Sequence, residues 1–173
     1  MKGQSVVHSK GKDDWTTPIW LFNFFNKDFK FGLDAAASDS NFLCPNYFTE
    51  EDDALKQSWK GYGNVFVNPP YSLNQKFIEK IIDELDGSFH VVALVPARTD
   101  VRWFHDYVLY AASEVWFIKG RLKFSNSENS APFPSMAVVF RDCVNSKGPH
   151  IYSLETPKNV RRNISTGIDC RAA

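Results

Sequence analysis

The stretch HVVALVP, residues 90–96, most constrains how this chain folds. It is a near-continuous apolar run, which is typical of a strand that is covered on both faces. The shorter run NVFV, residues 64–67, has the same character. Between them lies the segment 75–85, whose apolar residues recur at helical spacing: Phe77, Ile78, Ile81, Ile82 and Leu85. A strand, a helix and a strand in this order predict a parallel sheet with helices over its faces.

The same pattern continues along the chain. Further strands are expected at residues 29–34, 114–120 and 136–141, and further helices at residues 18–27, 50–59 and 101–112. Residues 35–49 are predicted to be irregular, and the chain beyond 142 has only weak periodicity. The predicted fold class is α/β, a single domain with a mostly parallel sheet and helices on both faces. Ligands of such folds bind outside the carboxyl ends of the strands. Asp34, Asn68–Tyr71 and Pro96–Arg98 each stand at such an end and are therefore expected to line one crevice.

Composition limits the classes of function. The 173 residues suit one domain, and 20 Lys+Arg against 20 Asp+Glu give no overall field that would attract nucleic acid or an anionic membrane. No run is long and apolar enough to cross a membrane, and the N-terminus lacks the apolar segment of a signal peptide. Three cysteines, Cys44, Cys143 and Cys170, without CxxC spacing predict neither a disulfide framework nor a metal site. We therefore expect a soluble intracellular protein.

The sequence Asn68-Pro69-Pro70-Tyr71 directly follows the predicted strand 64–67. Neither proline has an N–H, so they cannot continue a central strand. The Asn68 amide oxygen and the Pro69 carbonyl could accept both protons of a planar amino group and favour its pyramidalisation, while Tyr71 offers a face for a flat ring. This suits direct methyl transfer from a sulfonium donor. The alternative is a proline-rich turn that merely closes the strand.

Asp34 ends the predicted strand 29–34 and precedes three alanines. Its carboxylate would face the α-amino group of a methyl donor, and Ala35 and Ala36 would let that cofactor approach the backbone. No GxGxxG sequence is present, so a dinucleotide fingerprint is absent. The alternative role for Asp34 is that of a turn or cap residue.

Two further segments are candidates for cofactor binding. Asp53, rather than its neighbour Asp52, would bind the donor's adenine amine or ribose, although acids at a helix start are common without any such role. In Trp15-Thr16-Thr17-Pro18, Trp15 would cover the cofactor and Thr17 would bind its carboxylate. The alternative is a helix start with Thr17 as N-cap, Pro18 in the first turn and a packing tryptophan.

Basic residues near the expected crevice could form a local patch that contacts phosphates: Arg98, Arg102, Lys119, Arg121 and Lys123. Arg121 stands out because it follows Gly120 at the end of a predicted strand. A group of charges like this is otherwise ordinary solvated surface.

Taken together, these segments resemble the phage-type DNA N-6-adenine methyltransferases, the Dam-like family. The resemblance covers most of residues 13–141 and rests on WTTP at 15–18, LDAAAS at 33–38, EEDDALKQSW at 50–59, NPPYS at 68–72, LVPARTDVRWFH at 94–105 and IKGRLKF at 118–124. It implies a Rossmann-like methyltransferase fold, S-adenosylmethionine as donor and adenine in DNA as acceptor.

The resemblance also implies roles for residues. Those implied for transfer are Asn68, Pro69, Pro70 and Tyr71. Those implied for the cofactor are Trp15, Thr17, Pro18, Asp34, Ala35, Ala36, Asp53 and Asn68. Those implied for DNA are Tyr71, Arg98, Arg121 and Lys123, and no metal is implied.

The resemblance divides the chain into a flexible arm (1–12), a methyltransferase domain (13–141) and a C-terminal extension (142–173). About thirty residues separate Asp34 from Asn68, which leaves no room for a large target-recognition domain. The expected location is the cytoplasm of a bacterial host, and oligomeric state is left open. Two alternatives remain: a related methyltransferase that acts on RNA or on a protein glutamine amide, and a nucleic-acid-binding relative without activity.

Overall fold

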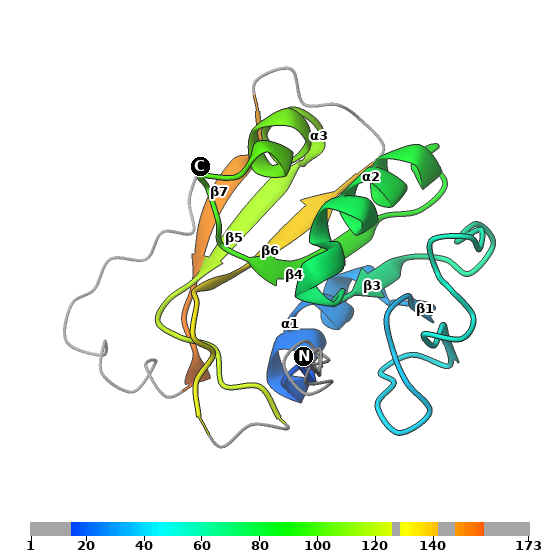
Figure 1. The fold of residues 1–173 in the computed structure, drawn as a ribbon, viewed down its shortest axis with the longest axis horizontal. Coiled ribbons are helices and arrows are strands. Elements are labelled where there is room, and N and C mark those ends of the chain that lie inside the picture. Colours follow the sequence, from blue (N-terminus) through cyan, green and yellow to red (C-terminus); the bar gives the residue numbers. More distant parts are fainter. Residues whose placement is uncertain (1–14, 126–128, 142–147, 158–173) are drawn as a thin grey trace, which may run out of the picture.

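The computed structural model describes residues 15–125, 129–141 and 148–157. Within them the chain forms a single α/β domain around one seven-stranded sheet (Figure 1). The strands are β1 (Leu33–Asp34), β2 (Asn46–Tyr47), β3 (Val65–Val67), β4 (Val91–Pro96), β5 (Glu114–Ile118), β6 (Ser135–Phe140) and β7 (His150–Leu154). Their spatial order is β2-β1-β3-β4-β6-β5-β7.

The sheet is mostly parallel, as predicted. Strands β2, β1, β3 and β4 pair in parallel, and so do β5 and β7. Strand β6 runs antiparallel to both of its neighbours, β4 and β5. The carboxyl ends of β1, β3 and β4 therefore meet at one edge of the sheet, which is where ligands bind in open α/β sheets.

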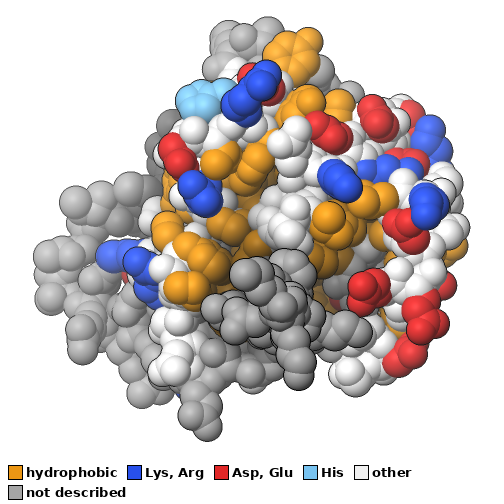
Figure 2. Space-filling model, in the orientation of Figure 1, with side chains coloured by type: hydrophobic (Ala, Val, Ile, Leu, Met, Phe, Trp, Pro, Cys, Tyr) orange, Lys and Arg blue, Asp and Glu red, His pale blue; other side chains and the backbone are white. Residues whose placement is uncertain are grey.

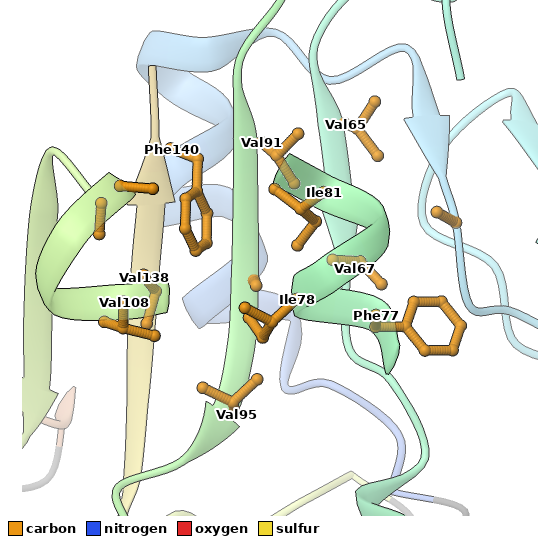
Figure 3. Packing of buried hydrophobic residues seen from close by; sticks show 14 of the residues in the cluster. Val65, Val67, Phe77, Ile78, Ile81, Val91, Val95, Val108, Val138 and Phe140 are labelled. Carbon is orange, nitrogen blue, oxygen red and sulfur yellow. The ribbon is translucent and has the colours of Figure 1, made fainter. Parts of the chain in front are cut away.

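One face of the sheet is covered by helix α2 (Asn74–Glu84), by the π-helical turn η2 (Phe104–Val108) and by α3 (Leu109–Ala111). Alternate residues of each strand point to this face, since side chains along a strand alternate between its two sides. Figure 3 shows Ile81 of α2 packed beside Val91 of β4, and Ile78 closer to Val95 of the same strand. The helical stripe predicted at residues 75–85 is therefore the buried side of α2.

The opposite face is covered by helix α1 (Ile19–Phe29), which in Figure 1 lies on the other side of the sheet from α2 and α3. The helix buries Leu21, Phe22, Phe25 and Phe29. Strand residues between those of the first face, such as Phe66 and Val92, pack against them. Helices thus lie on both faces, which confirms the prediction and explains why β3 and β4 are apolar throughout.

Two predicted elements are wrong in part. Residues 50–59 form successive turns instead of a helix, because Asp53 has φ of 54°, a left-handed conformation that a right-handed helix cannot include. The predicted strand 29–34 is paired only at Leu33–Asp34, because Phe29 still belongs to α1 and Lys30 closes that helix with φ of 53°.

Other differences concern single elements. The helix predicted at 101–112 is present but includes the π-helical turn η2. Strand β7 was not predicted: it lies in the stretch expected to be a C-terminal extension and forms an edge of the sheet beside β5. Among the described residues, no helix combines the length and apolar character that a membrane-spanning segment needs. The predicted arm, residues 1–12, lies outside the described residues.

Candidate active site

The Asn68–Tyr71 segment leaves the sheet at the carboxyl end of β3. The 3-10 turn η1 (Tyr71–Leu73) follows at once, and the Leu73 N–H donates to the Pro70 carbonyl at 2.8 Å. Helix α2 then begins at Asn74, whose side-chain nitrogen donates to the Tyr71 carbonyl at 2.9 Å. The two prolines thus pass the chain from a buried strand into a tight, hydrogen-bonded turn.

The Asn68 side chain is held by the segment that precedes α1. Its Nδ2 donates to the Trp15 carbonyl at 2.5 Å and to the Thr17 hydroxyl at 3.0 Å. These two acceptors fix which end of the amide is nitrogen, because a reversed amide would set its oxygen against the Trp15 carbonyl oxygen. The opposite atom, Oδ1, is buried and has no hydrogen-bond partner among the described residues. A buried acceptor without a partner is costly, so this atom is suited to receive an N–H from a ligand.

Thr17 is not the N-cap of α1, which was the alternative role left open for it. The N-cap residue is Pro18, and no side chain caps the helix. The Thr17 hydroxyl instead accepts from Asn68, and Thr17 is buried, with 4% of its surface exposed. The backbone of the preceding Thr16 accepts from the Ser125 N–H at 2.9 Å. Residues 15–17 therefore connect Asn68 with the loop that follows Gly120.

Aromatic side chains surround Tyr71. Phe133 packs against it edge to face, with ring centroids 4.5 Å apart, and the Trp15 ring lies at 6.2 Å. Trp15 in turn lies 5.1 Å from Phe124. Because Phe124 and Phe133 come from the loop between β5 and β6, this loop closes one side of the site.

A cavity of about 200 Å³ opens beside Tyr71. Its walls come from three parts of the chain and are formed by Tyr71, Asn74, Pro96, Arg98, Val101, Trp103 and Phe133. The segments Asn68–Tyr71 and Pro96–Arg98 were expected to line one crevice. Of these residues, Tyr71, Pro96 and Arg98 line the cavity. Asp34 is not part of this wall.

Asp34 lies deep at the end of β1, directly beside Phe66 of β3. Only 4% of its surface is exposed, and its carboxylate accepts the N–H groups of Leu43 at 3.1 Å and Ala36 at 3.4 Å. Burial raises the pKa of Asp34 to about 6, and the two N–H groups oppose that rise. In this structure the carboxylate closes the loop between β1 and β2. Ala35 is buried, and its N–H donates to the Phe66 carbonyl at 2.9 Å.

Asp53 occupies a turn at the surface. Its carboxylate lies 2.7 Å from Lys56 Nζ, and hydrogen bonding to Lys56 holds the pKa of Asp53 below its usual value. The neighbouring Asp52 is committed to Thr49, whose N–H and hydroxyl each lie 2.8 Å from Oδ2. Asp52 therefore shapes the turn, while Asp53 keeps a carboxylate that is partly exposed.

The predicted basic residues are mostly paired with acids. Arg98 binds Asp100 at 3.0 Å, Arg102 lies 3.7 Å from Asp106, and Lys119 binds Glu155 at 2.7 Å. Arg121 donates weakly to the Ala131 carbonyl at 3.4 Å, and Lys123 is exposed. Figure 2 shows that acidic side chains gather along one edge of the molecule, on the side of the loop that contains Asp52 and Asp53. The basic side chains are spread singly rather than joined in one patch on this face.

Sequence reasoning did not single out Asn74, Trp103 or Phe133 as site residues. Phe133 lies between two prolines in a polar loop, which is an unusual place for an aromatic residue and a signal that could have been used. Asn74 and Trp103 carry no comparable signal. Across the described ranges, no three His, Cys, Asp or Glu side chains gather as metal ligands would.

Comparison with known proteins places the chain in a family. The family model described as DNA N-6-adenine-methyltransferase (Dam) matches residues 4–165. A DNA N-6-adenine-methyltransferase of Haemophilus phage HP1 is 31% identical over 150 residues, which cover 81% of this chain and 85% of that protein. One of Escherichia phage T1 is 32% identical over 106 residues, covering 61% of this chain but only 44% of that protein. The chain belongs to the DNA N-6-adenine-methyltransferase (Dam) family.

Proposed function

We propose that this chain is an adenine-specific DNA methyltransferase that transfers a methyl group from S-adenosylmethionine to the exocyclic N6 of adenine in DNA. One observation carries the proposal: within the described ranges the Asn68 amide oxygen is buried without a partner, while the amide nitrogen is held by Trp15 and Thr17. An acceptor oriented in this way suits an amino group. Membership of the Dam family and the names of the phage relatives support the same activity.

The fold is proposed to be of the Rossmann-like methyltransferase type. In support, β6 is the one described strand that runs against the others, and Asp34, Asn68 and Pro96 stand at the carboxyl ends of β1, β3 and β4. The catalytic domain would span residues 13–141, with the C-terminal stretch 142–173 adding β7 at the edge of the sheet.

The polar groups near the strand ends fit S-adenosylmethionine as the methyl donor. An ionised carboxylate has about four lone-pair sites, so Asp34 keeps accepting capacity beyond its bonds to Ala36 and Leu43. An ammonium group beside it would stabilise its charged form against the desolvation that raises its pKa to about 6. The residues proposed to hold the cofactor are Trp15, Thr17, Pro18, Asp34, Ala35, Ala36, Asp53 and Asn68. When bound, the cofactor supplies an electrophilic methyl group on a sulfonium.

The chain's own residues act on the amino group. The Asn68 amide oxygen and the Pro69 carbonyl would accept hydrogen bonds from the two N–H groups of the adenine amino group. These bonds favour a pyramidal nitrogen, whose lone pair is less conjugated with the ring and is available for attack. The prolines keep these two acceptors rigid. Tyr71 would support the ring by stacking, which requires the adenine to leave the duplex stack first. Because Asn68–Tyr71 holds no general base, the released proton would pass to solvent.

The proposed contacts to DNA are Tyr71 at the base, and Arg98, Arg121 and Lys123 at phosphates. Of these, Arg98 lines the cavity beside Tyr71, while Arg121 and Lys123 belong to the loop whose Phe124 packs on Trp15. Each basic residue that binds a phosphate releases counterions, so affinity would fall with added salt.

Substrate class is tested by supplying methyl-labelled S-adenosylmethionine with DNA, RNA and protein in parallel. Labelled N6-methyladenine is expected in DNA. Label in RNA or in a glutamine amide, with none in DNA, would overturn the proposal in favour of a related methyltransferase. Isothermal titration with S-adenosylmethionine separates the remaining case, because a nucleic-acid-binding relative without activity would not bind the donor.

The role of Asn68 is tested by Asn68→Ala. Loss of one oriented acceptor is expected to lower kcat by about 10²–10³-fold or more. Donor affinity measured by titration is expected to be largely spared, because Asn68 is one of several residues proposed to hold the cofactor. Near-normal turnover of Asn68→Ala would show that another group holds the amino nitrogen.

A further inference from the structure

The cavity beside Tyr71 contains a second amide with an unused acceptor. Asn74 lines this cavity and is buried, with 6% of its surface exposed. Its Oδ1 is buried, and no residue in the described part of the chain hydrogen-bonds to it. The other side chains of the wall are aromatic or apolar apart from Arg98, which is a donor. Among these residues Asn74 therefore contributes the one amide oxygen.

The orientation of the Asn74 amide is set by the chain itself. Its Nδ2 donates to the Tyr71 carbonyl at 2.9 Å, and the reversed amide would place two oxygens against each other. The unsatisfied atom is thus an acceptor, and it calls for an N–H or O–H on whatever occupies the cavity.

The cavity is separate from the place of transfer. Neither Asn68 nor Pro69 belongs to its described wall. The Tyr71 ring, on which a base would stack for transfer, is contacted edge to face by Phe133 at 4.5 Å. A base in the cavity would therefore lie beside Tyr71 before it reaches Asn68.

We propose that this cavity is a docking subsite for the base that leaves the DNA stack, and that Asn74 selects an amino-bearing base there through its amide oxygen. This inference rests on the proposed function and deepens it. Asn74 is a specificity-determining residue that acts on binding, whereas Asn68 acts on transfer.

The selection has a simple chemical basis. Adenine presents an N–H donor at its position 6, which pairs with the Asn74 acceptor. Hypoxanthine and guanine present a carbonyl oxygen at the same position, so two acceptors would face each other in a buried site. Purine, which has no substituent there, would leave the Asn74 oxygen unsatisfied.

The test measures binding without transfer. The protein is saturated with S-adenosylhomocysteine to fill the donor site and is then titrated with 2′-deoxyadenosine, 2′-deoxyinosine and purine 2′-deoxyriboside. The readout is the NMR shift of the Asn74 side-chain amide and the Trp103 indole. Both signals are expected to move with 2′-deoxyadenosine, with affinity at least about tenfold higher than for the other two nucleosides.

Two substitutions separate the acceptor from the bond to Tyr71. Asn74→Ala removes the acceptor oxygen and the hydrogen bond to Tyr71, and it is expected to abolish the preference for 2′-deoxyadenosine. Asn74→Asp removes only the donor to Tyr71 and keeps an acceptor oxygen, so the preference for 2′-deoxyadenosine is expected to remain. With DNA, Asn74→Ala would raise KM about tenfold at nearly unchanged kcat. In both variants the side-chain amide of residue 74 is gone, so the Trp103 indole alone reports binding. If Asn74→Ala does not fold, the wild-type preference and Asn74→Asp still decide.

Three results would overturn the inference: equal affinity of the wild type for all three nucleosides, no movement of the Asn74 and Trp103 signals, or a preference that survives in Asn74→Ala and vanishes in Asn68→Ala. Failure of the proposed function looks different, because the nucleoside preference would remain while DNA receives no methyl group. Methylated DNA without the nucleoside preference would refute the role of Asn74 alone.

Discussion

The side-chain nitrogen of Asn68 lies 3.0 Å from the hydroxyl oxygen of Thr17, a residue 51 positions earlier in the chain. Through this bond and the one to the Trp15 carbonyl, the segment before α1 decides where the Asn68 oxygen points. Thr17, which is proposed to touch the cofactor, is therefore also a positioning residue for the proposed methyl transfer.

Thr17→Val is expected to lower kcat for methyl transfer by about fivefold. Valine keeps the shape of threonine but removes the acceptor, so the Asn68 amide loses one of the two bonds that orient it, worth about 1 kcal/mol. Steady-state kinetics with DNA gives the measurement. Thr17→Ser retains a hydroxyl and serves as the matched control, with turnover near that of the wild type. Equal turnover of Thr17→Val and Thr17→Ser would mean that the hydroxyl does not orient Asn68.

Asp34 should make the free energy of unfolding depend on pH. Burial raises its pKa from 3.8 to about 6, so the folded protein binds this proton more tightly than the unfolded chain does. This contribution favours folding below about pH 4 and is lost as pH rises through about 6, a change of roughly 3 kcal/mol at most.

The measurement for Asp34 compares the wild type with Asp34→Asn by urea unfolding at several pH values between 4 and 8. The amide of the variant does not titrate, so the stability of the wild type relative to it is expected to fall as pH rises from 4 to above 6. A constant difference between the two proteins across this range would mean that Asp34 titrates normally in the folded state.

Asp53 combines a left-handed backbone with a proposed role at the cofactor, and substitutions can separate the two. Asp53→Gly is expected to keep or slightly raise stability, because glycine adopts φ of 54° without strain. Asp53→Asn tolerates the same backbone and removes only the charge. If the carboxylate binds the donor, both variants should weaken S-adenosylmethionine binding by about tenfold in titration calorimetry.

The contrasting variant is Lys56→Ala, which removes the 2.7 Å ion pair and leaves the Asp53 carboxylate in place. It should bind the donor at least as well as the wild type. Unchanged donor affinity in Asp53→Gly and Asp53→Asn would assign Asp53 to the turn alone.

Gly32 permits two segments to touch at the start of β1. A Cβ at this position would lie 1.9 Å from the Tyr62 carbonyl oxygen, which is far inside any real contact. Gly32→Ala is therefore expected to destabilise the protein by about 3 kcal/mol or more, measured by chemical unfolding. Gly61→Ala is the comparison, because that position has φ of 87° but open space around it and should cost about 1 kcal/mol. Similar losses in the two variants would mean that the 60–63 loop moves aside.

The family and the main layers of the fold could be predicted from the sequence. The apolar runs of β3 and β4 and the helical stripe of α2 require a sheet that is covered on both faces. The segment Asn68-Pro69-Pro70-Tyr71 at the end of β3 suggested a site for a planar amino group. Its residue types alone place an amide, a carbonyl and an aromatic ring close together. These features depend on local composition and spacing, so a single sequence is enough to predict them.

Contacts between distant segments could not be predicted. The bond between Asn68 and Thr17, the approach of Phe133 to Tyr71, and the cavity at Asn74 join residues that only the folded chain brings together. The turn at Asp53 could not be predicted either. Acidic residues before an apolar residue are typical of a helix start, whereas the left-handed backbone of Asp53 depends on the surrounding packing. The sequence alone is enough to propose the chemistry, because the residue types of one short segment suggest it. The orientation of the proposed acceptors is decided only by the tertiary structure, because it depends on partners far away in the chain.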